Sequence, residues 1–196
     1  LLLMRDPHFF SAYLDDAGGE LMRENFERHG ITIIAGDEIA SMRREKIGVN
    51  AYTRKGEIIA ADAIAVGIGI ARNREFLHGA SILTGDHGIR VNEYLETNQE
   101  GIFAAGDIAE VYDPQRKGFR YAGNWTNAFL QGKCAGLNML GKKEPFRAIP
   151  AYSITNLGFQ ITVLGECRGA EESITRIARE EKIYERLFLS GGALQG

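Results

Sequence analysis

The first thirty residues alternate between a strand pattern and a helix pattern. The apolar run Leu1 to Met4 predicts a buried strand. Asp15 or Asp16 can cap a helix that continues to about His29, and Gly30 is a typical residue to end it. The apolar face of this helix is formed by Leu21, Met22 and Phe26. The pattern therefore predicts a β–α pair.

Strand patterns dominate the next forty residues. Ile31 to Ile34 is apolar and β-branched, which predicts a second strand. Residues 47–53 and 57–60 flank a glycine-containing turn and predict a hairpin on the outside of the fold. Ala63 to Val66 predicts a further apolar strand, which leads into Gly67-Ile68-Gly69. Glycines after a strand mark a place where the backbone approaches something closely.

A second segment runs from about residue 75 to 148 and contains short strands and one long helix. Ile89 to Val91 and Ile102 to Ala105 predict short strands, and Gly106-Asp107 predicts a strand-to-helix turn after the second strand. A polar loop around Asp113-Pro114 follows. The stretch from about Asn124 to Leu140 has small and apolar residues at helical spacing and predicts a long helix.

The last fifty residues favour β structure. Residues 161–164 and 184–189 predict strands, and the glycine turn after the second one predicts a returning strand. The mixed-charge stretch Glu171 to Lys182 is typical of an exposed amphipathic helix or loop. The apolar start without an initiator methionine and the glycine turn at the end lead us to expect that the chain is cut at both ends.

Composition and charge exclude several classes of protein. The 196 residues are 44% hydrophobic and 25% charged, as in an ordinary globular protein. A net charge of −3 lacks the concentrated positive field that nucleic acids require. No apolar run approaches the roughly 20 residues that cross a bilayer. We therefore expect neither a nucleic-acid nor a membrane partner, and a cytoplasmic location.

Cysteine and histidine positions offer no redox or metal motif. The two cysteines are too far apart for a CxxC pair and are expected to remain thiols. Cys134 lies on an apolar face in the middle of the long helix and is predicted to pack there, and Cys167 is predicted to be a solvent-accessible thiol. The four histidines have no spacing with cysteine or carboxylate that predicts a metal site.

Three stretches carry a resemblance to a known family. Residues 97–107 (TNQEGIFAAGD) combine a polar turn, an apolar strand and a terminal Gly-Asp. Residues 61–73 combine a strand with a glycine turn, and Asn124 to Ala128 with Gln131-Gly132-Lys133 open the long helix. In this order they resemble the two-dinucleotide flavoproteins of the pyridine nucleotide-disulfide oxidoreductase family, which includes NADH oxidases, ferredoxin and rubredoxin reductases, and the flavin part of nitrite reductases.

The resemblance implies an α/β fold that is part of a two-dinucleotide-binding, Rossmann-like flavoprotein with a β-rich C-terminal interface segment. Residues 1–74 would be the C-terminal part of the NAD(P)-binding domain. Residues 75–148 would be the C-terminal part of the FAD-binding domain, and residues 149–196 the start of the β-rich interface domain. The family often has proline before the asparagine at position 73, whereas this chain has Arg72.

The turn at Gly106-Asp107 is the strongest candidate cofactor site. A glycine at the end of a strand lets a ligand approach bare backbone, and a following helix start offers N–H groups to a pyrophosphate. A carboxylate accepts hydrogen bonds from sugar-like hydroxyls, and the resemblance implies that Asp107 holds the ribityl chain of FAD. The alternative interpretation is that Asp107 only caps its helix.

The start of the long helix is the second candidate. The resemblance implies that Trp125, Thr126 and Ala128 face the flavin. A helix N-terminus aimed at the pyrimidine edge would stabilise the negative charge that forms there on reduction. For Trp125 the alternative interpretation is an ordinary buried aromatic residue at a helix start.

Gly67, Gly69 and Arg5 are the candidates on the nicotinamide nucleotide side. The two glycines resemble the turn at the end of the NAD(P) domain, with a tight packing turn as the alternative interpretation. Arg5 follows the first strand, where an acid favours NAD and an arginine accommodates the phosphate of NADP. A solvated charge is the other interpretation, so the cofactor preference stays open.

The implied parent reaction is hydride transfer from NAD(P)H to FAD and onward to an acceptor: oxygen, a disulfide, an iron–sulfur protein or a nitrite-reducing partner. The chain has no GxGxxG loop, so the 196 residues alone are expected to hold neither cofactor tightly and to be inactive. A non-catalytic dinucleotide-fold module for binding or assembly is the alternative, and a single-domain NAD-binding regulator ranks last. A homodimer of the parent is also expected from the resemblance.

Overall fold

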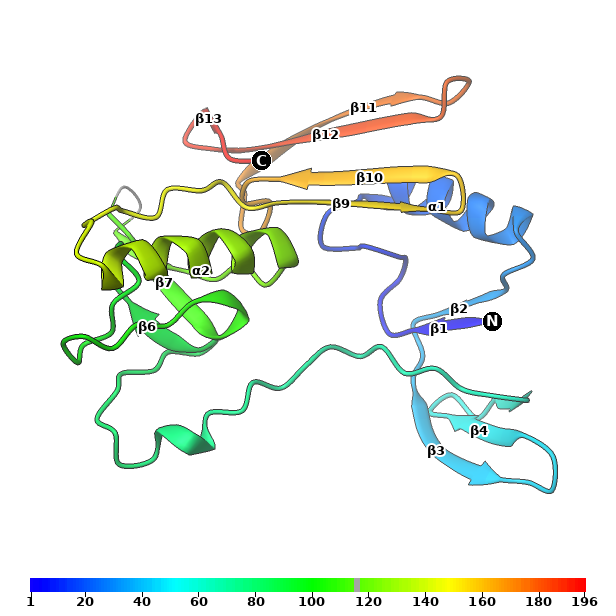
Figure 1. Cartoon of the computed structure of the whole chain (residues 1–196). Helices are drawn as coiled ribbons and strands as arrows, with labels where there is room; N and C mark the ends of the chain where they lie inside the picture. The colour runs from blue at the N-terminus through cyan, green and yellow to red at the C-terminus, as the bar shows by residue number, and fades with distance from the viewer. Residues whose placement is uncertain (115–116) are drawn as a thin grey trace. The chain divides into compact units, whose positions relative to one another are not determined.

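The computed structural model describes residues 1–114 and 117–196, which form two compact units. The first unit comprises residues 1–68, 155–159 and 166–196, and the second comprises residues 69–154 and 160–165. Figure 1 shows the elements of both units in chain order.

The first unit begins with the predicted β–α pair. Strand β1 (Leu2–Met4) pairs in parallel with β2 (Ile33–Ala35), and α1 (Asp16–Arg28) connects them (Figure 1). Helix α1 starts where it does because the Asp15 side chain accepts a hydrogen bond from the amide of Gly18, 3.0 Å away. The predicted helix and both strands are confirmed within two residues.

Two antiparallel sheets also belong to the first unit, together with residues 155–159. One contains β3 (Ile39–Arg44), β4 (Val49–Thr53) and β5 (Ile58–Ala61), and its β4–β5 pair is the predicted hairpin. The other has the strand order β11-β12-β13, and the last strand is the predicted returning strand. Its bounds are Glu172–Ala178 for β11, Ile183–Ser190 for β12 and Ala193–Leu194 for β13.

The second unit is built around a three-stranded sheet and one long helix. The sheet contains β6 (Ile89–Val91), β7 (Ala109–Asp113) and β8 (Gly118–Arg120), with β6 parallel and β8 antiparallel to β7. Helix α2 (Trp125–Met139) confirms the predicted long helix, with Asn124 as its cap. Short 3-10 turns, η1 and η2, cover Glu75–Leu77 and Gly106–Ile108. Strands β9 (Ala151–Asn156) and β10 (Phe159–Leu164) form a separate two-stranded sheet.

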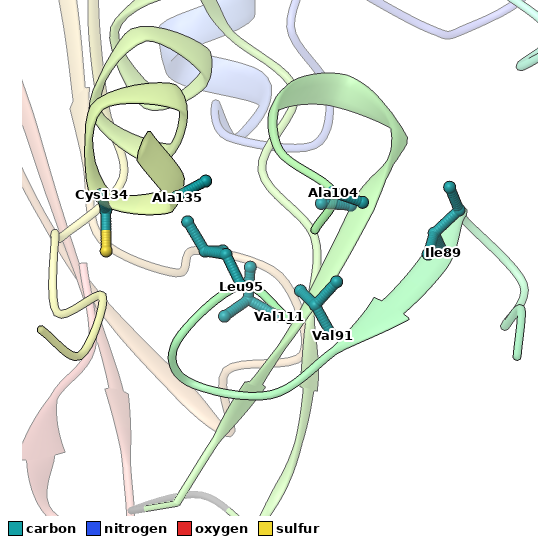
Figure 2. Packing of buried hydrophobic residues seen from close by; sticks show 8 residues of the cluster. Ile89, Val91, Leu95, Ala104, Val111, Cys134 and Ala135 are labelled. Atoms are coloured by element: carbon teal, nitrogen blue, oxygen red, sulfur yellow. The ribbon is translucent and has the colours of Figure 1, made fainter. Parts of the chain in front are cut away.

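The core of the second unit lies between the three-stranded sheet β6-β7-β8 and helix α2. Leu95 and Ala109 are completely buried, and Val91 is 2% exposed. Figure 2 shows their neighbourhood, with Cys134 and Ala135 contributed by α2. Burial of Cys134 confirms its predicted packing role.

Three predicted elements are wrong. Residues 63–66 lie in a stretch without regular structure, and none of the described strands pairs with them, which a strand requires. Ile102 to Ala105 makes only an isolated bridge between Phe103 and Glu96. The stretch 171–182 contains strand β11 instead of a helix or loop, because β-branched residues pair with β12 while the charges stay on exposed positions.

Cys167 corrects a further expectation. Its exposed fraction is 7%, so it is not the solvent-accessible thiol that the sequence predicted. Burial raises the pKa of the Cys167 thiol, and the charge of neighbouring Glu166 raises it further. A thiol with a raised pKa is a poor nucleophile.

Candidate functional site

The Gly106-Asp107 turn differs from the predicted strand-to-helix turn. Gly106, Asp107 and Ile108 form the short turn η2, and strand β7 begins directly after it. Gly106 has a φ of +82°, a backbone conformation that strongly favours glycine. Since no helix follows Asp107, the interpretation of Asp107 as a helix cap is wrong.

Helix α2 holds this turn from one side. The amide of Gly106 donates to Oε1 of Gln131 over 2.7 Å, and Gln131 is only 2% exposed. A Cβ atom on Gly106 would lie 3.5 Å from the Cβ of Ala128. The sequence placed Ala128 in the candidate site, but it assigned no role to Gln131, whose only signal was its place in the helix motif.

Asp107 keeps its carboxylate available. The residue is half-buried, and its side chain has no hydrogen-bond partner among residues 1–114 and 117–196. Its backbone carbonyl, in contrast, accepts a hydrogen bond from Nε of Arg72 over 2.6 Å. The backbone is therefore held while the two carboxylate oxygens remain free to accept hydrogen bonds from a ligand.

The start of α2 also has free polar groups. Asn124 accepts a hydrogen bond from the amide of Asn127 through its side chain, 2.8 Å away. Within the described chain, the amides of Trp125 and Thr126 have no hydrogen-bond partner, as expected for the first residues of a helix. The side chain of Trp125 is 95% exposed, so the interpretation of Trp125 as a buried aromatic residue is wrong.

Arg72, which contacts the turn, belongs to a set of side chains in mutual contact that the sequence did not reveal. The guanidinium carbon of Arg72 lies 3.9 Å from the ring centroid of Tyr121, and His87 stacks on the same tyrosine. Glu110 is 4% exposed and accepts hydrogen bonds from the amides of His87 and Gly88. These residues are distant in sequence, so spacing could not group them.

The candidates on the nicotinamide nucleotide side lie apart from this turn in the chain. Gly67 and Gly69 belong to the irregular stretch between β5 and η1, and only Gly69 has a positive φ, +91°. Arg5 follows β1 in the first unit, where its Nε lies 4.0 Å from a carboxylate oxygen of Glu38. Arg5 is 75% exposed, so it remains accessible to a ligand.

The described residues lack two other kinds of feature. No helix there is both long and apolar enough to span a bilayer. Residues 1–114 and 117–196 contain no group of three or more histidine, cysteine or acidic side chains arranged to bind a metal ion.

This chain is similar in sequence to a known protein family. Residues 1–132 match the family model of pyridine nucleotide-disulphide oxidoreductases. The chain is 31% identical to rhodocoxin reductase of Rhodococcus erythropolis over 147 residues, which cover 74% of this chain and 34% of that protein. The chain thus spans about a third of the length of this relative.

Solved structures show the same fold. A ferredoxin reductase from Rhodopseudomonas palustris superposes with a TM-score of 0.88 at 20% identity, over 98% of this chain and 48% of that one. Putidaredoxin reductase in its covalent complex with putidaredoxin gives a TM-score of 0.89 at 19% identity, over 99% and 47%. The predicted α/β fold, part of a Rossmann-like flavoprotein, is confirmed.

Proposed function

The chain belongs to the pyridine nucleotide-disulphide oxidoreductase family, and we propose that it is part of an enzyme that transfers hydride from NAD(P)H to FAD and then to an acceptor. FAD would supply the redox chemistry, because its ring accepts the hydride and passes electrons on. The residues of this chain would bind, orient and electrostatically stabilise the cofactors.

The observation that carries the proposal is the free carboxylate of Asp107 on a turn with fixed backbone. Gly106 leaves bare backbone beside it, and the Gly106 amide is already held by Gln131. The half-buried Asp107 side chain has no hydrogen-bond partner among the described residues, so both carboxylate oxygens can accept hydrogen bonds from a ligand. The ribityl hydroxyls of FAD are donors of the right kind, so these residues fit the cofactor.

The start of α2 supports the same cofactor. The free amides of Trp125 and Thr126 lie at the positive end of a helix of 15 residues. This arrangement favours an anionic group and would stabilise negative charge on a reduced flavin. The exposed ring of Trp125 offers a flat apolar surface for packing against the cofactor.

For the nicotinamide nucleotide we propose Arg5, Gly67 and Gly69. Arg5 follows a parallel strand, and ligands of open α/β sheets bind beyond the carboxyl ends of such strands. The positive φ of Gly69 supports a turn that a larger residue would strain. The proposal further includes a cytoplasmic homodimer with the β-rich segment at its interface.

The decisive experiment replaces Asp107 in the full-length protein. Asp107→Asn and Asp107→Leu should weaken FAD binding, since hydrogen bonds to a charged group contribute about 1.5–3 kcal/mol each, roughly tenfold or more in affinity. Flavin fluorescence quenching measures the dissociation constant. Asp86→Asn is the matched control, because Asp86 is exposed in the same unit and loses the same charge.

The proposal would be refuted if the full-length protein purified without flavin and did not bind added FAD. It would also be refuted if both Asp107 variants bound FAD as tightly as the Asp86→Asn control.

A further inference from the structure

Arg72 makes a direct contact with the backbone of the candidate flavin turn. Its Nε donates to the carbonyl oxygen of Asp107 over 2.6 Å, and the arginine is half-buried. Both residues belong to the second unit. Because a guanidinium stays charged at any physiological pH, this is a charge-assisted hydrogen bond that persists throughout the working range.

Tyr121 limits the positions that this guanidinium can adopt. The guanidinium carbon is 3.9 Å from the centroid of the tyrosine ring, within the range of a cation–π contact. His87 stacks on Tyr121 with 5.3 Å between ring centroids and 21° between planes. The hydrogen bond and the ring contact together hold the arginine in one orientation.

Strand β7, which follows the turn, holds the loop that carries His87. Glu110 lies in β7, three residues after Asp107, and its side chain is almost fully buried. Its Oε1 accepts the amide of Gly88 over 2.7 Å and also the amide of His87. The contacts therefore form a closed cycle. It runs from Asp107 to Arg72, Tyr121, His87 and Glu110, and β7 leads back to Asp107.

From this cycle of contacts we infer that Arg72 is a positioning residue for flavin binding, an inference that rests on the proposed function. Arg72 fixes the peptide after Asp107, with Tyr121 and His87 holding the guanidinium, so that the carboxylate is already oriented when FAD arrives. Preorganised groups bind more tightly because less freedom is lost on binding. Without Arg72, the same carboxylate would be present but would be held in position less often.

The test uses Arg72→Met and Arg72→Lys in the full-length protein. Arg72→Met keeps an apolar stem but removes both contacts, and we expect the dissociation constant for FAD to rise at least tenfold. Arg72→Lys keeps a charge that can make one of the two contacts, so its affinity should lie between those of Arg72→Met and the wild type. Hydrogen exchange of the backbone amides at residues 105–109, measured without flavin, should accelerate at least fivefold in Arg72→Met.

Arg74→Met is the matched control. Arg74 also donates to a backbone carbonyl, from Nη1 to Gly85 over 2.7 Å, but it does not contact the turn. This variant should bind FAD within twofold of the wild type and leave exchange at residues 105–109 unchanged. A second pair of variants tests the contact between Arg72 and the Tyr121 ring. Tyr121→Leu should behave like Arg72→Met, and Tyr121→Phe, which keeps the aromatic ring, should behave like the wild type.

The outcomes separate this inference from the proposed function. If the wild type binds FAD but Arg72→Met and Tyr121→Leu bind it within twofold of the wild type, the role of Arg72 is refuted and the proposed function stands. If the wild type binds no FAD, the proposed function fails. If exchange at residues 105–109 is also unchanged in Arg72→Met, Arg72 does not position the turn. Should Arg72→Met fail to fold, the comparison of Tyr121→Leu with Tyr121→Phe decides.

Discussion

Gly88 allows the start of β6 to approach the turn η2 more closely than any residue with a side chain would allow. Gly88 is buried directly before β6, opposite Ile108 of the turn η2. A Cβ atom on Gly88 would lie 1.9 Å from the carbonyl oxygen of Ile108 and 2.7 Å from its carbonyl carbon. Both are backbone atoms, so no side-chain rotation can relieve the clash. We therefore expect Gly88→Ala to displace the turn.

The structure sets the size of this effect. Real Cβ atoms essentially never approach another heavy atom within 3.0 Å, so the segments must separate by at least 3.0 − 1.9 = 1.1 Å. Overpacking of this kind costs about 1–3 kcal/mol. A shift of η2 also strains the 2.7 Å hydrogen bond from Gly106 to Gln131, which adds about 0.5–1.5 kcal/mol. The expected loss of stability is about 1.5–4.5 kcal/mol.

Urea denaturation and FAD titration of the full-length protein test this expectation. Gly88→Ala should lower the denaturation midpoint and weaken FAD binding together, because the displaced turn carries Asp107. Gly132→Ala is the control: Gly132 lies inside α2, the added Cβ would meet nothing within 4 Å beyond the adjacent residues and the backbone of its own helix, and the change should stabilise by about 0.5–1 kcal/mol. Gly88→Ala with unchanged midpoint and unchanged affinity would show that our account of the turn is wrong.

Three further predictions concern the first unit. Arg5→Glu should shift the ratio of kcat/KM between NADPH and NADH at least tenfold toward NADH, and an unchanged ratio would exclude Arg5 from the nucleotide site. Asp15→Ala should destabilise by about 1 kcal/mol at neutral pH, measured by urea denaturation. Burial opposes ionisation of Asp15, but hydrogen bonds from Gly18 and others lower its pKa below 3.8, so the loss should shrink as pH falls below that value. Cys167 should react with a maleimide at the rate of global unfolding, and rapid labelling of the native protein would contradict its burial.

Elements with strong local signals were predictable from the sequence. Helix α1 has its cap at Asp15 and a glycine at its end, and the β4–β5 hairpin has a glycine turn between apolar runs. Helix α2 likewise begins directly after the predicted Asn124, which caps it. Capping and turn preferences act within a few residues, so a local pattern contains them.

Elements that depend on distant partners were not predictable. Residues 63–66 are as apolar as a strand, yet no described strand pairs with them. Strand β11 contains several charged residues, yet it pairs with β12. Strands β3, β7 and β8 were not predicted, and β9 lies in a segment that was predicted only to be rich in β structure. A strand is stabilised by its neighbours across the sheet, and these lie elsewhere in the sequence.

The candidate site divides in the same way. Gly106, Asp107 and the start of α2 could be picked out from the sequence, because these stretches resemble motifs of the family. Only the tertiary structure showed that η2 is followed by a strand, that Gln131 and Arg72 hold its backbone, and that Trp125 is exposed. These contacts join segments up to 35 residues apart along the chain. Sequence patterns record local chemistry, whereas the fold decides which distant groups meet.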